Sequence, residues 1–338
     1  MNQSDKRFDP ISWIESNLDL AETDTTSFIY DLVESQSGRC LPIIYEPFDP
    51  DHPSHFADRG NVFDFMPSKG GRVLDFGPGD GWPSLIVAQY CDEVVGVDGS
   101  AKRVAVCQAN ATRLGITNIR FVHVSPGTPL PFDSDSFDGA MAASSVEQTP
   151  EPRAVLTELH RVLKPGGRLR LHYEALGRYR GGQERDLWLW RDEERPRHLI
   201  IYDRYIDKEY AKQYRLTLDL AGDEVEDIFR RHGQKVSFSG LTEAVLAELK
   251  RHVTAAAVCE TQHPSGATLA RWLAEVGFAK VLPTHRGARF AKRLFEKLLN
   301  EQRPRTIEGI DALLKPLVEI VVALPAPIED DPMITAIK

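Results

Sequence analysis

Two acidic residues on either side of a glycine-rich turn are the part of this sequence that most clearly indicates chemistry. Asp75 lies in a short apolar run at 72–76, a Gly-Pro-Gly-Asp-Gly turn follows at 77–81, and Asp98 ends a second apolar run. Glycines let the backbone turn sharply and approach a ligand closely, and a helix that begins after the turn offers N–H groups to an anion. A carboxylate at the tip of the second run can accept hydrogen bonds from both hydroxyls of a ribose. The pattern predicts a site for a ligand that contains a nucleoside.

A strand–helix–strand unit is needed to bring these residues together. We expect strands at 72–76 and 93–97, with a helix at 84–90 between them. The third glycine of the turn is Gly81, and Trp82 stands where the dinucleotide pattern G-x-G-x-x-G requires a glycine. The spacing therefore does not favour a dinucleotide.

Four motifs in order carry a resemblance to a known family. They are the acid-led G-x-G-x-G turn with its second acid, Leu-Pro-Phe-Asp at 130–133, Ser-Phe-Asp-Gly at 136–139, and Arg-Val-Leu-Lys-Pro-Gly-Gly at 161–167. This series resembles the class I S-adenosylmethionine-dependent methyltransferases, in particular the type 11 branch. The resemblance implies an α/β, Rossmann-like fold with a mostly parallel seven-stranded sheet and an antiparallel last strand. It also implies S-adenosyl-L-methionine as cofactor and S-adenosyl-L-homocysteine as product.

The resemblance further implies a set of cofactor contacts. In the family's pattern, Asp75 and the three glycines of the turn surround the methionine carboxylate and amine, and Asp98 takes the ribose hydroxyls. Most relatives carry an acid after the third strand that meets the adenine amine, but this chain has Ser125 there. A hydroxyl accepts more weakly than a carboxylate, so backbone contacts are expected to take more of that role. The predicted cofactor-binding residues are Asp75, Gly77, Gly79, Gly81, Asp98, Gly99, Ser100, Ser125 and Ser144.

Methyl transfer from a sulfonium requires alignment of the reactants and exclusion of water more than covalent help. A general base is needed only if the acceptor carries a proton of unsuitable pKa. The catalytic candidates are His172, near the end of the predicted fifth strand (168–173), and Glu147, after the predicted fourth strand (138–143). His172 also suits a strand histidine with satisfied hydrogen bonds, and Glu147 a cofactor contact or a helix cap, so these interpretations stay open. Relatives often have Glu-His where this chain has Glu147 followed by Gln148.

An insertion after the fifth strand is the predicted substrate region. Residues 177–215 are rich in arginines and aromatics, and a β-hairpin is expected around 207–208. Ligands collect at the carboxyl ends of strands in α/β folds, so we interpret the insertion as a substrate cap, with an oligomer interface as the alternative. The predicted substrate-binding residues are Tyr45, Tyr173, Arg178, Tyr179 and Trp188.

The expected organisation has four segments. Residues 1–60 form an N-terminal helical lid or strap, with helices at 11–20 and 26–34, and residues 61–176 form the cofactor-binding core. Residues 177–264 form the cap, and 265–338 complete the core sheet. This last segment contains an inserted helical pair at about 288–325 and a final strand at 333–337.

Composition narrows the function classes. The formal net charge of −9 argues against a broad nucleic-acid footprint. The four cysteines have no C-x-x-C spacing, so neither a disulfide framework nor a metal site is expected. No apolar leader or run of about 18 apolar residues occurs. We therefore expect a cytoplasmic protein without nucleic-acid or membrane partners.

The sequence as a whole predicts a methyltransferase that acts on a small-molecule acceptor, anionic or of mixed aromatic and polar character. The alternatives are another S-adenosylmethionine-dependent transferase and a non-catalytic cofactor-binding subunit that serves a partner. A homodimer through the cap or the C-terminal helical pair is a further hypothesis. The acceptor atom cannot be chosen from the sequence.

Overall fold

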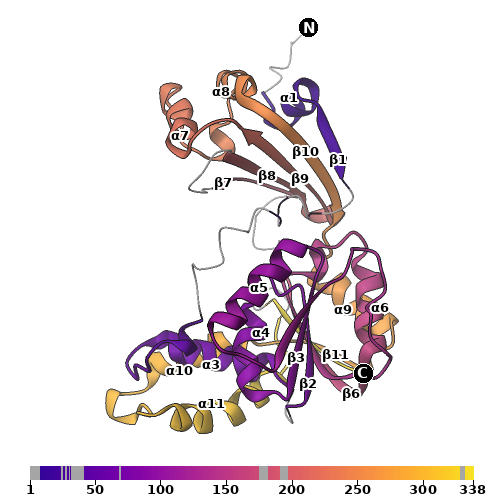
Figure 1. Ribbon diagram of the computed structural model, residues 1–338, viewed down its shortest axis with the longest axis vertical. Helices are drawn as coiled ribbons and strands as arrows, with labels where there is room; N and C mark the ends of the chain where they lie inside the picture. The colour runs from indigo at the N-terminus through magenta and orange to yellow at the C-terminus, as the bar shows by residue number, and fades with distance from the viewer. Residues whose placement is uncertain are drawn as a thin grey trace. The chain divides into compact units, whose positions relative to one another are not determined.

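The structure is a computed structural model that describes residues 8–23, 26, 29, 31, 42–67, 70–174, 182–190, 197–327 and 332–338. The chain divides into two compact units (Figure 1). Unit 1 comprises residues 1–29 and 179–263, and unit 2 comprises residues 30–178 and 264–338. The segment predicted as a single lid at 1–60 is therefore shared between the units, with 1–29 in unit 1.

Unit 2 is built on a seven-stranded sheet in the order β4-β3-β2-β5-β6-β12-β11. The first five of these strands are parallel, and β12 runs antiparallel to both of its neighbours. This is the mostly parallel sheet that was predicted, and the Rossmann-like fold class is confirmed. The strands are β2 (Arg72–Phe76), β3 (Glu93–Asp98), β4 (Ile119–His123), β5 (Phe137–Ala143), β6 (Leu163–His172), β11 (Lys280–Thr284) and β12 (Met333–Ile337).

Helices cover both faces of this sheet, because alternate residues of its buried strands point to opposite sides. In β2, Val73 belongs to one apolar cluster and Leu74 to the other. The first cluster joins the sheet to α3, α4, α10 and α11, and the second joins it to α6 and α9 (Figure 1). The predicted helical pair at 288–325 corresponds to α10 and α11. The helices are α3 (Pro53–Phe65), α4 (Trp82–Val87), α5 (Ala101–Arg113), α6 (Pro152–Val162), α9 (Gly266–Glu275), α10 (Gly287–Lys297) and α11 (Ile307–Val321).

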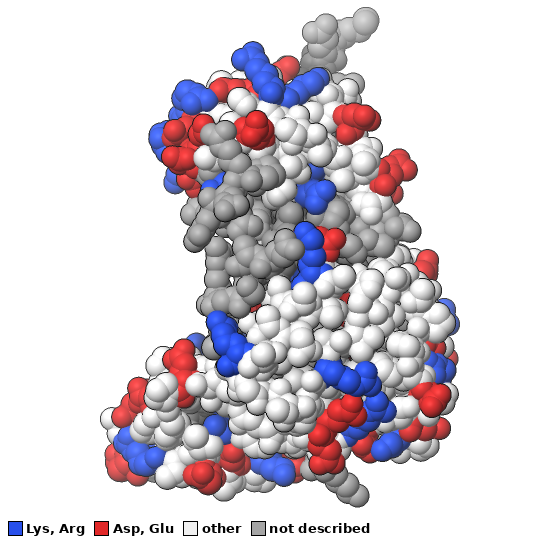
Figure 2. All heavy atoms as spheres, viewed as in Figure 1, with Lys and Arg blue, Asp and Glu red and all other residues white. Residues whose placement is uncertain are grey.

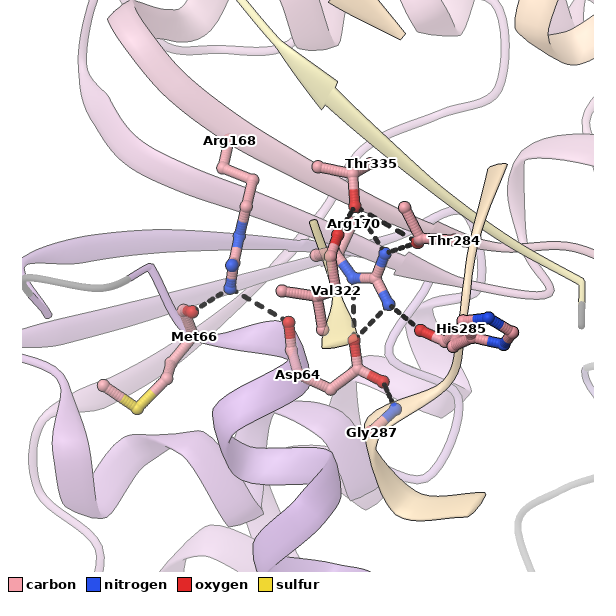
Figure 3. Close-up of polar contacts among 9 residues, drawn as sticks. All are labelled: Asp64, Met66, Arg168, Arg170, Thr284, His285, Gly287, Val322 and Thr335. Atoms are coloured by element: carbon pink, nitrogen blue, oxygen red, sulfur yellow. Dashed lines mark hydrogen bonds and ion pairs between the residues drawn. The ribbon is translucent and has the colours of Figure 1, made fainter. Parts of the chain in front are cut away.

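A buried ion pair joins the helical pair to the sheet (Figure 3). Arg170 of β6 and Asp64 of α3 are both fully buried, and the guanidinium Nε donates to Asp64 Oδ1 at 2.7 Å. Arg170 also donates to the hydroxyls of Thr284 and Thr335, at 2.5 and 2.7 Å. The other carboxylate oxygen accepts from the backbone N–H of Gly287, the first residue of α10, at 2.6 Å. One pair of charges thus connects α3, three strands and the start of α10.

A second buried polar contact fixes α11. Arg59 of α3 is 1% exposed and donates to both carboxylate oxygens of Asp311, at 2.9 and 3.0 Å. The hydroxyl of Tyr90 donates to the same carboxylate at 2.7 Å. The helical pair is therefore anchored to α3 at both of its helices.

Unit 1 is a five-stranded sheet in the order β1-β10-β9-β8-β7. Its helices cover one face through a separate apolar cluster. The predicted hairpin corresponds to β8 and β9, whereas Leu20, predicted as the end of a helix, begins a strand that pairs in parallel with β10. Most of the predicted helix at 26–34 lies outside the described residues. The elements are α1 (Pro10–Asn17), β1 (Leu20–Thr23), β7 (Gln183–Trp190), β8 (Arg197–Tyr205), β9 (Tyr210–Leu218), α7 (Gly222–Arg231), α8 (Glu243–Leu249) and β10 (Val253–Gln262).

The surface visible in Figure 2 carries acidic and basic side chains interspersed on both units. Among the described residues, no helix is long and apolar enough to cross a membrane. Nor do the described side chains include a group of three His, Cys, Asp or Glu that could hold a metal ion.

Candidate functional site

The glycine turn lies between β2 and α4, at the carboxyl ends of the parallel strands. Gly77, Gly79 and Gly81 all have positive φ, at +68°, +65° and +96°. The N–H of Gly77 donates to the carbonyl of Val97 at 2.8 Å, which fixes the turn against β3. A Cβ atom at Gly77 would lie 2.3 Å from the Cβ of Ser145. Only glycine meets both demands at this position.

Replacing Gly77 with alanine should destabilise unit 2 by about 3 kcal/mol, because a left-handed backbone and a steric collision add together. Gly115 is the matched control, since it has φ +70° and nothing within 4 Å of its ideal Cβ. Gly115→Ala should therefore cost only the backbone term of about 1 kcal/mol. Urea denaturation of the two variants measures the difference. Equal losses would contradict the role of the Ser145 contact.

Asp75 is a fully buried acid beside this turn. Its Oδ2 accepts a hydrogen bond from the Ser84 hydroxyl at 2.6 Å, whereas Oδ1 is buried and has no hydrogen-bond partner in the structure. Burial raises the pKa of Asp75 to about 7, and the nearby charges of Asp98 and Asp80 add to the rise. A buried carboxyl with one uncommitted oxygen suits the ammonium group of a ligand, which would favour the ionised form.

Asp98 ends β3 and is half-buried. Burial raises the pKa of this carboxyl, although the N–H of Ser100 donates to its Oδ1 at 2.9 Å. Ser100 is 3% exposed and is the N-cap of α5, where its hydroxyl oxygen accepts from the N–H of Arg103 at 3.2 Å. The same hydroxyl donates to Asp31 Oδ1 at 2.6 Å. The side chain of Ser100 thus holds local structure, and the contact of Asp98 with a ribose stays a prediction.

The end of β4 lies next to this corner. The imidazole Nε2 of His123 is 3.1 Å from the carbonyl oxygen of Gly99. An ideal Cβ on Gly99 would lie 3.1 Å from a ring carbon of Pro126, so the loops after β3 and β4 are in contact. Ser125 is exposed, and its carbonyl accepts from the N–H of Thr128 at 3.2 Å. The predicted residues Gly99 and Ser125 therefore belong to one corner of the site.

Ser144 and His172 form a pair at the ends of β5 and β6. The N–H of Ser144 donates to the carbonyl of His172 at 2.7 Å, and its Oγ lies 2.9 Å from His172 Nδ1. Ser144 has φ +54°, a left-handed conformation that is uncommon for a residue with a side chain. Such conformations concentrate at functional sites, where surrounding contacts enforce them. Here both contacts come from His172.

Glu147 lies in the turn that follows Ser144. It is 1% exposed, its Oε1 accepts from the N–H of Glu174 at 2.7 Å, and its Oε2 is buried with no hydrogen-bond partner in the structure. Burial raises the pKa of Glu147 to about 7, and the charge of Glu174 adds to the rise. A carboxyl in this state can hold or release a proton near neutral pH.

Glu147 should make the stability of unit 2 fall as pH rises. Its folded pKa of about 7 lies above the ordinary 4.5, so the folded state binds the proton more tightly and is favoured at low pH. The cost of ionisation appears between pH 4.5 and 7 and reaches about 3 kcal/mol. Glu147→Gln should therefore be more stable than the wild type at pH 8 and similar to it at pH 4.5. Denaturation at both pH values tests this, and a difference independent of pH would contradict it.

The predicted substrate residues are dispersed. The hydroxyl of Tyr45 donates to the carbonyl of Leu85 at 2.5 Å, and Tyr173 is 2% exposed within the core cluster on the α6 side. Trp188 is 55% exposed on β7 of unit 1, where its indole N–H donates to Asp186. Arg178 and Tyr179 lie outside the described residues. Tyr45 and Tyr173 thus have structural contacts that their sequence context did not reveal.

Two residues near the cofactor corner were missed by sequence reasoning. Asp31 meets Ser100 from a segment far earlier in the chain, which no spacing rule connects to it. Arg103 lies in the first turn of α5, and its Nη1 would be 3.1 Å from an ideal Cβ on Gly79. Its charge lowers the pKa of Asp98 against the effect of burial. Its position three residues after the N-cap Ser100 is a signal that could have identified it.

Comparisons with known proteins identify the family. The sequence model of a family described as "Methyltransferase domain" matches residues 74–171, from β2 to β6. Residues 74–171 thus form a class I S-adenosylmethionine-dependent methyltransferase domain of the type 11 branch. The cofactor of this family is S-adenosyl-L-methionine, and the buried Oδ1 of Asp75 beside the glycine turn fits its charged methionine end.

Individual relatives match this chain over part of its length. A demethylmenaquinone methyltransferase of Clavibacter sepedonicus is 40% identical over 103 residues, 30% of this chain and 41% of that protein. A ubiquinone biosynthesis O-methyltransferase of Paracidovorax citrulli is 31% identical over 120 residues, 36% of this chain and 50% of that protein. The solved structure of the YcgJ protein from Bacillus subtilis has a TM-score of 0.39 at 19% identity, covering 85% of this chain and 99% of that chain. The chain thus spans half or less of the length of these two curated relatives.

Proposed function

We propose that the protein is an S-adenosylmethionine-dependent methyltransferase that acts on a small-molecule acceptor. The observation that carries the proposal is the set of groups at the carboxyl ends of β2 and β3. A turn of three glycines with positive φ, a buried acid with one uncommitted oxygen and a second acid at the strand tip occur together there. They match the carboxylate, ammonium and ribose of one ligand.

Each residue then has a defined task. The glycine turn lets the methionine end of the cofactor approach the backbone closely, Asp75 holds the ammonium group, and Asp98 accepts from the ribose hydroxyls. When bound, S-adenosylmethionine supplies a methyl group activated by the positive sulfur. Alignment of the acceptor with that methyl group falls to residues at the ends of β5 and β6.

The acceptor is proposed to carry an aromatic ring and an ionisable group. The two relatives described above are named for steps on demethylmenaquinone and in ubiquinone biosynthesis. An ionisable hydroxyl or an acidic carbon needs a proton acceptor at neutral pH. His172, whose Nδ1 lies 2.9 Å from Ser144 Oγ, is the proposed acceptor of that proton.

His172→Gln should lower turnover about a hundredfold while leaving cofactor affinity unchanged, as expected for the loss of a general base. The matched control is His160→Gln on α6, where the ring packs against Phe278. Both variants are assayed by formation of S-adenosylhomocysteine with an extract that supplies acceptors. Full turnover in His172→Gln would exclude His172 as the base.

Calorimetric titration with S-adenosylmethionine, S-adenosylhomocysteine and NAD tests the proposal as a whole. Micromolar binding of both sulfur nucleosides without binding of NAD is the expected result. Failure of both sulfur nucleosides to bind would overturn it. Formation of S-adenosylhomocysteine with an extract then distinguishes an enzyme from a binding subunit.

A further inference from the structure

The place of the nucleobase follows from the order of the strands. The glycine turn follows β2, the ribose acid Asp98 ends β3, and β4 is the next strand. A nucleoside that lies across the carboxyl ends of these strands puts its base beyond Asp98, toward β4. The base corner is therefore formed by the loops after β3 and β4, which touch at Gly99 and Pro126.

Adenine presents an exocyclic amine, which needs an acceptor. The loop after β4 contains no Asp or Glu between residues 122 and 132, and its Ser125 is exposed. A carboxylate that reaches the loop after β3 belongs to Asp31. Its Oδ1 accepts from the hydroxyl of Ser100, two residues beyond Asp98, at 2.6 Å.

Asp31 has a second carboxylate oxygen that can accept a further hydrogen bond. The side chain is half-buried, and no described residue donates to its Oδ2. The start of α5 does not need this acid, because the hydroxyl oxygen of Ser100 already accepts from the N–H of Arg103. The bond from Ser100 instead fixes the carboxylate and leaves one oxygen for a ligand.

We propose that Asp31 is the base-specificity residue of the cofactor site and accepts a hydrogen bond from the exocyclic amine of adenine. The inference rests on the proposed function, because it assumes an adenosyl ligand. In this chain no acid follows β4 to accept from the adenine amine, and Asp31 takes that role instead. Asp31 binds and selects, and it takes no part in methyl transfer.

The test compares two nucleosides that differ at this amine. S-Inosyl-L-homocysteine carries a carbonyl oxygen where S-adenosyl-L-homocysteine carries the amine. A carboxylate should reject that oxygen, because two acceptors then face each other without a proton. We expect the full-length wild type to bind the adenosyl compound at least about tenfold more tightly, as measured by calorimetry.

Asp31→Asn is the informative variant, because an amide can turn its NH2 group toward the carbonyl oxygen. The preference for the adenosyl compound should fall to about threefold or less, mainly through tighter binding of the inosyl compound. Asp31→Ala should also lose most of the preference. Glu46→Gln is the matched control, since Glu46 is an exposed acid of the same N-terminal region, and it should keep the wild-type ratio.

The outcomes separate the two hypotheses. If the Asp31 variants weaken both nucleosides equally and keep the wild-type ratio, Asp31 only stabilises the corner and the inference is overturned. A wild type without preference between the nucleosides overturns it as well. If the wild type binds neither nucleoside, the proposed function fails, and the inference fails with it.

Discussion

Replacing Asp98 with alanine should lower the affinity for S-adenosylhomocysteine by at least about a hundredfold. Two hydrogen bonds from ribose hydroxyls to a charged acceptor are lost together, and each contributes about 1.5–3 kcal/mol. The fold should survive, because Asp98 is half-buried and accepts hydrogen bonds from the backbone N–H groups of the nearby Ser100 and Gly79. Calorimetric titration measures the affinity, and circular dichroism confirms the fold.

Asp92→Ala is the matched control for this experiment. Asp92 is an exposed acid that precedes the opposite end of the same strand. The Asp92→Ala substitution removes one negative charge, as Asp98→Ala does, but lies away from the site. The affinity for S-adenosylhomocysteine should therefore stay within about twofold of the wild type. If Asp98→Ala binds as tightly as Asp92→Ala, the ribose assignment is wrong.

Removing the carboxylate of Asp64 should destabilise unit 2 by about 3–5 kcal/mol, because Arg170 would remain buried without a counter-charge. The fully buried guanidinium keeps its bonds to Thr284 and Thr335, but no described anion replaces Asp64 there. The N–H of Gly287 also loses its acceptor. The double variant Asp64→Leu, Arg170→Met should recover most of the loss, since replacing both partners avoids a buried charge.

Hydrogen exchange localises this effect. Protection of β6 and β12 should fall in Asp64→Ala, whereas protection of β8 in unit 1 serves as an internal reference. The surface control is Glu275→Ala, which breaks an ion pair with Arg153. In this pair the side chain of Arg153 is 56% exposed and that of Glu275 is 41% exposed. This pair should contribute less than about 1 kcal/mol. Similar losses in the buried and exposed variants would refute the importance of the buried pair.

The fold of unit 2 could be predicted because its signals are local. Apolar runs and the glycine turn indicated the strands, and the motif order indicated how they are arranged. The fifth strand was predicted to begin at 168, after Gly-Gly at 166–167, but β6 begins at Leu163 and includes both glycines. The final strand at 333–337 also matched its apolar pattern. The positions of Asp75 within β2 and of Asp98 at the end of β3 followed from the apolar runs, and their roles toward a cofactor stay predictions.

The remaining features depend on contacts between distant segments. Leu20 to Thr23 pairs with β10, and the alternation of a four-residue strand is too short to distinguish it from the end of a helix. Asp31 meets Ser100 through tertiary structure. Tyr173 packs into the core. Its position directly after a strand is compatible with burial as well as with substrate contact. Residues whose roles are set by partners far along the chain leave no local pattern to detect.

The position of β12 has a consequence for folding during synthesis. This strand pairs with β6 on one side and β11 on the other, yet it follows both in the chain. The strands of unit 1, by contrast, are all synthesised by residue 262. Unit 1 can therefore complete its sheet on the ribosome while β6 still presents an unpaired edge, which is prone to association with other chains. Because β12 is synthesised last, we expect unit 2 to be the part of the nascent protein that most needs protection by chaperones.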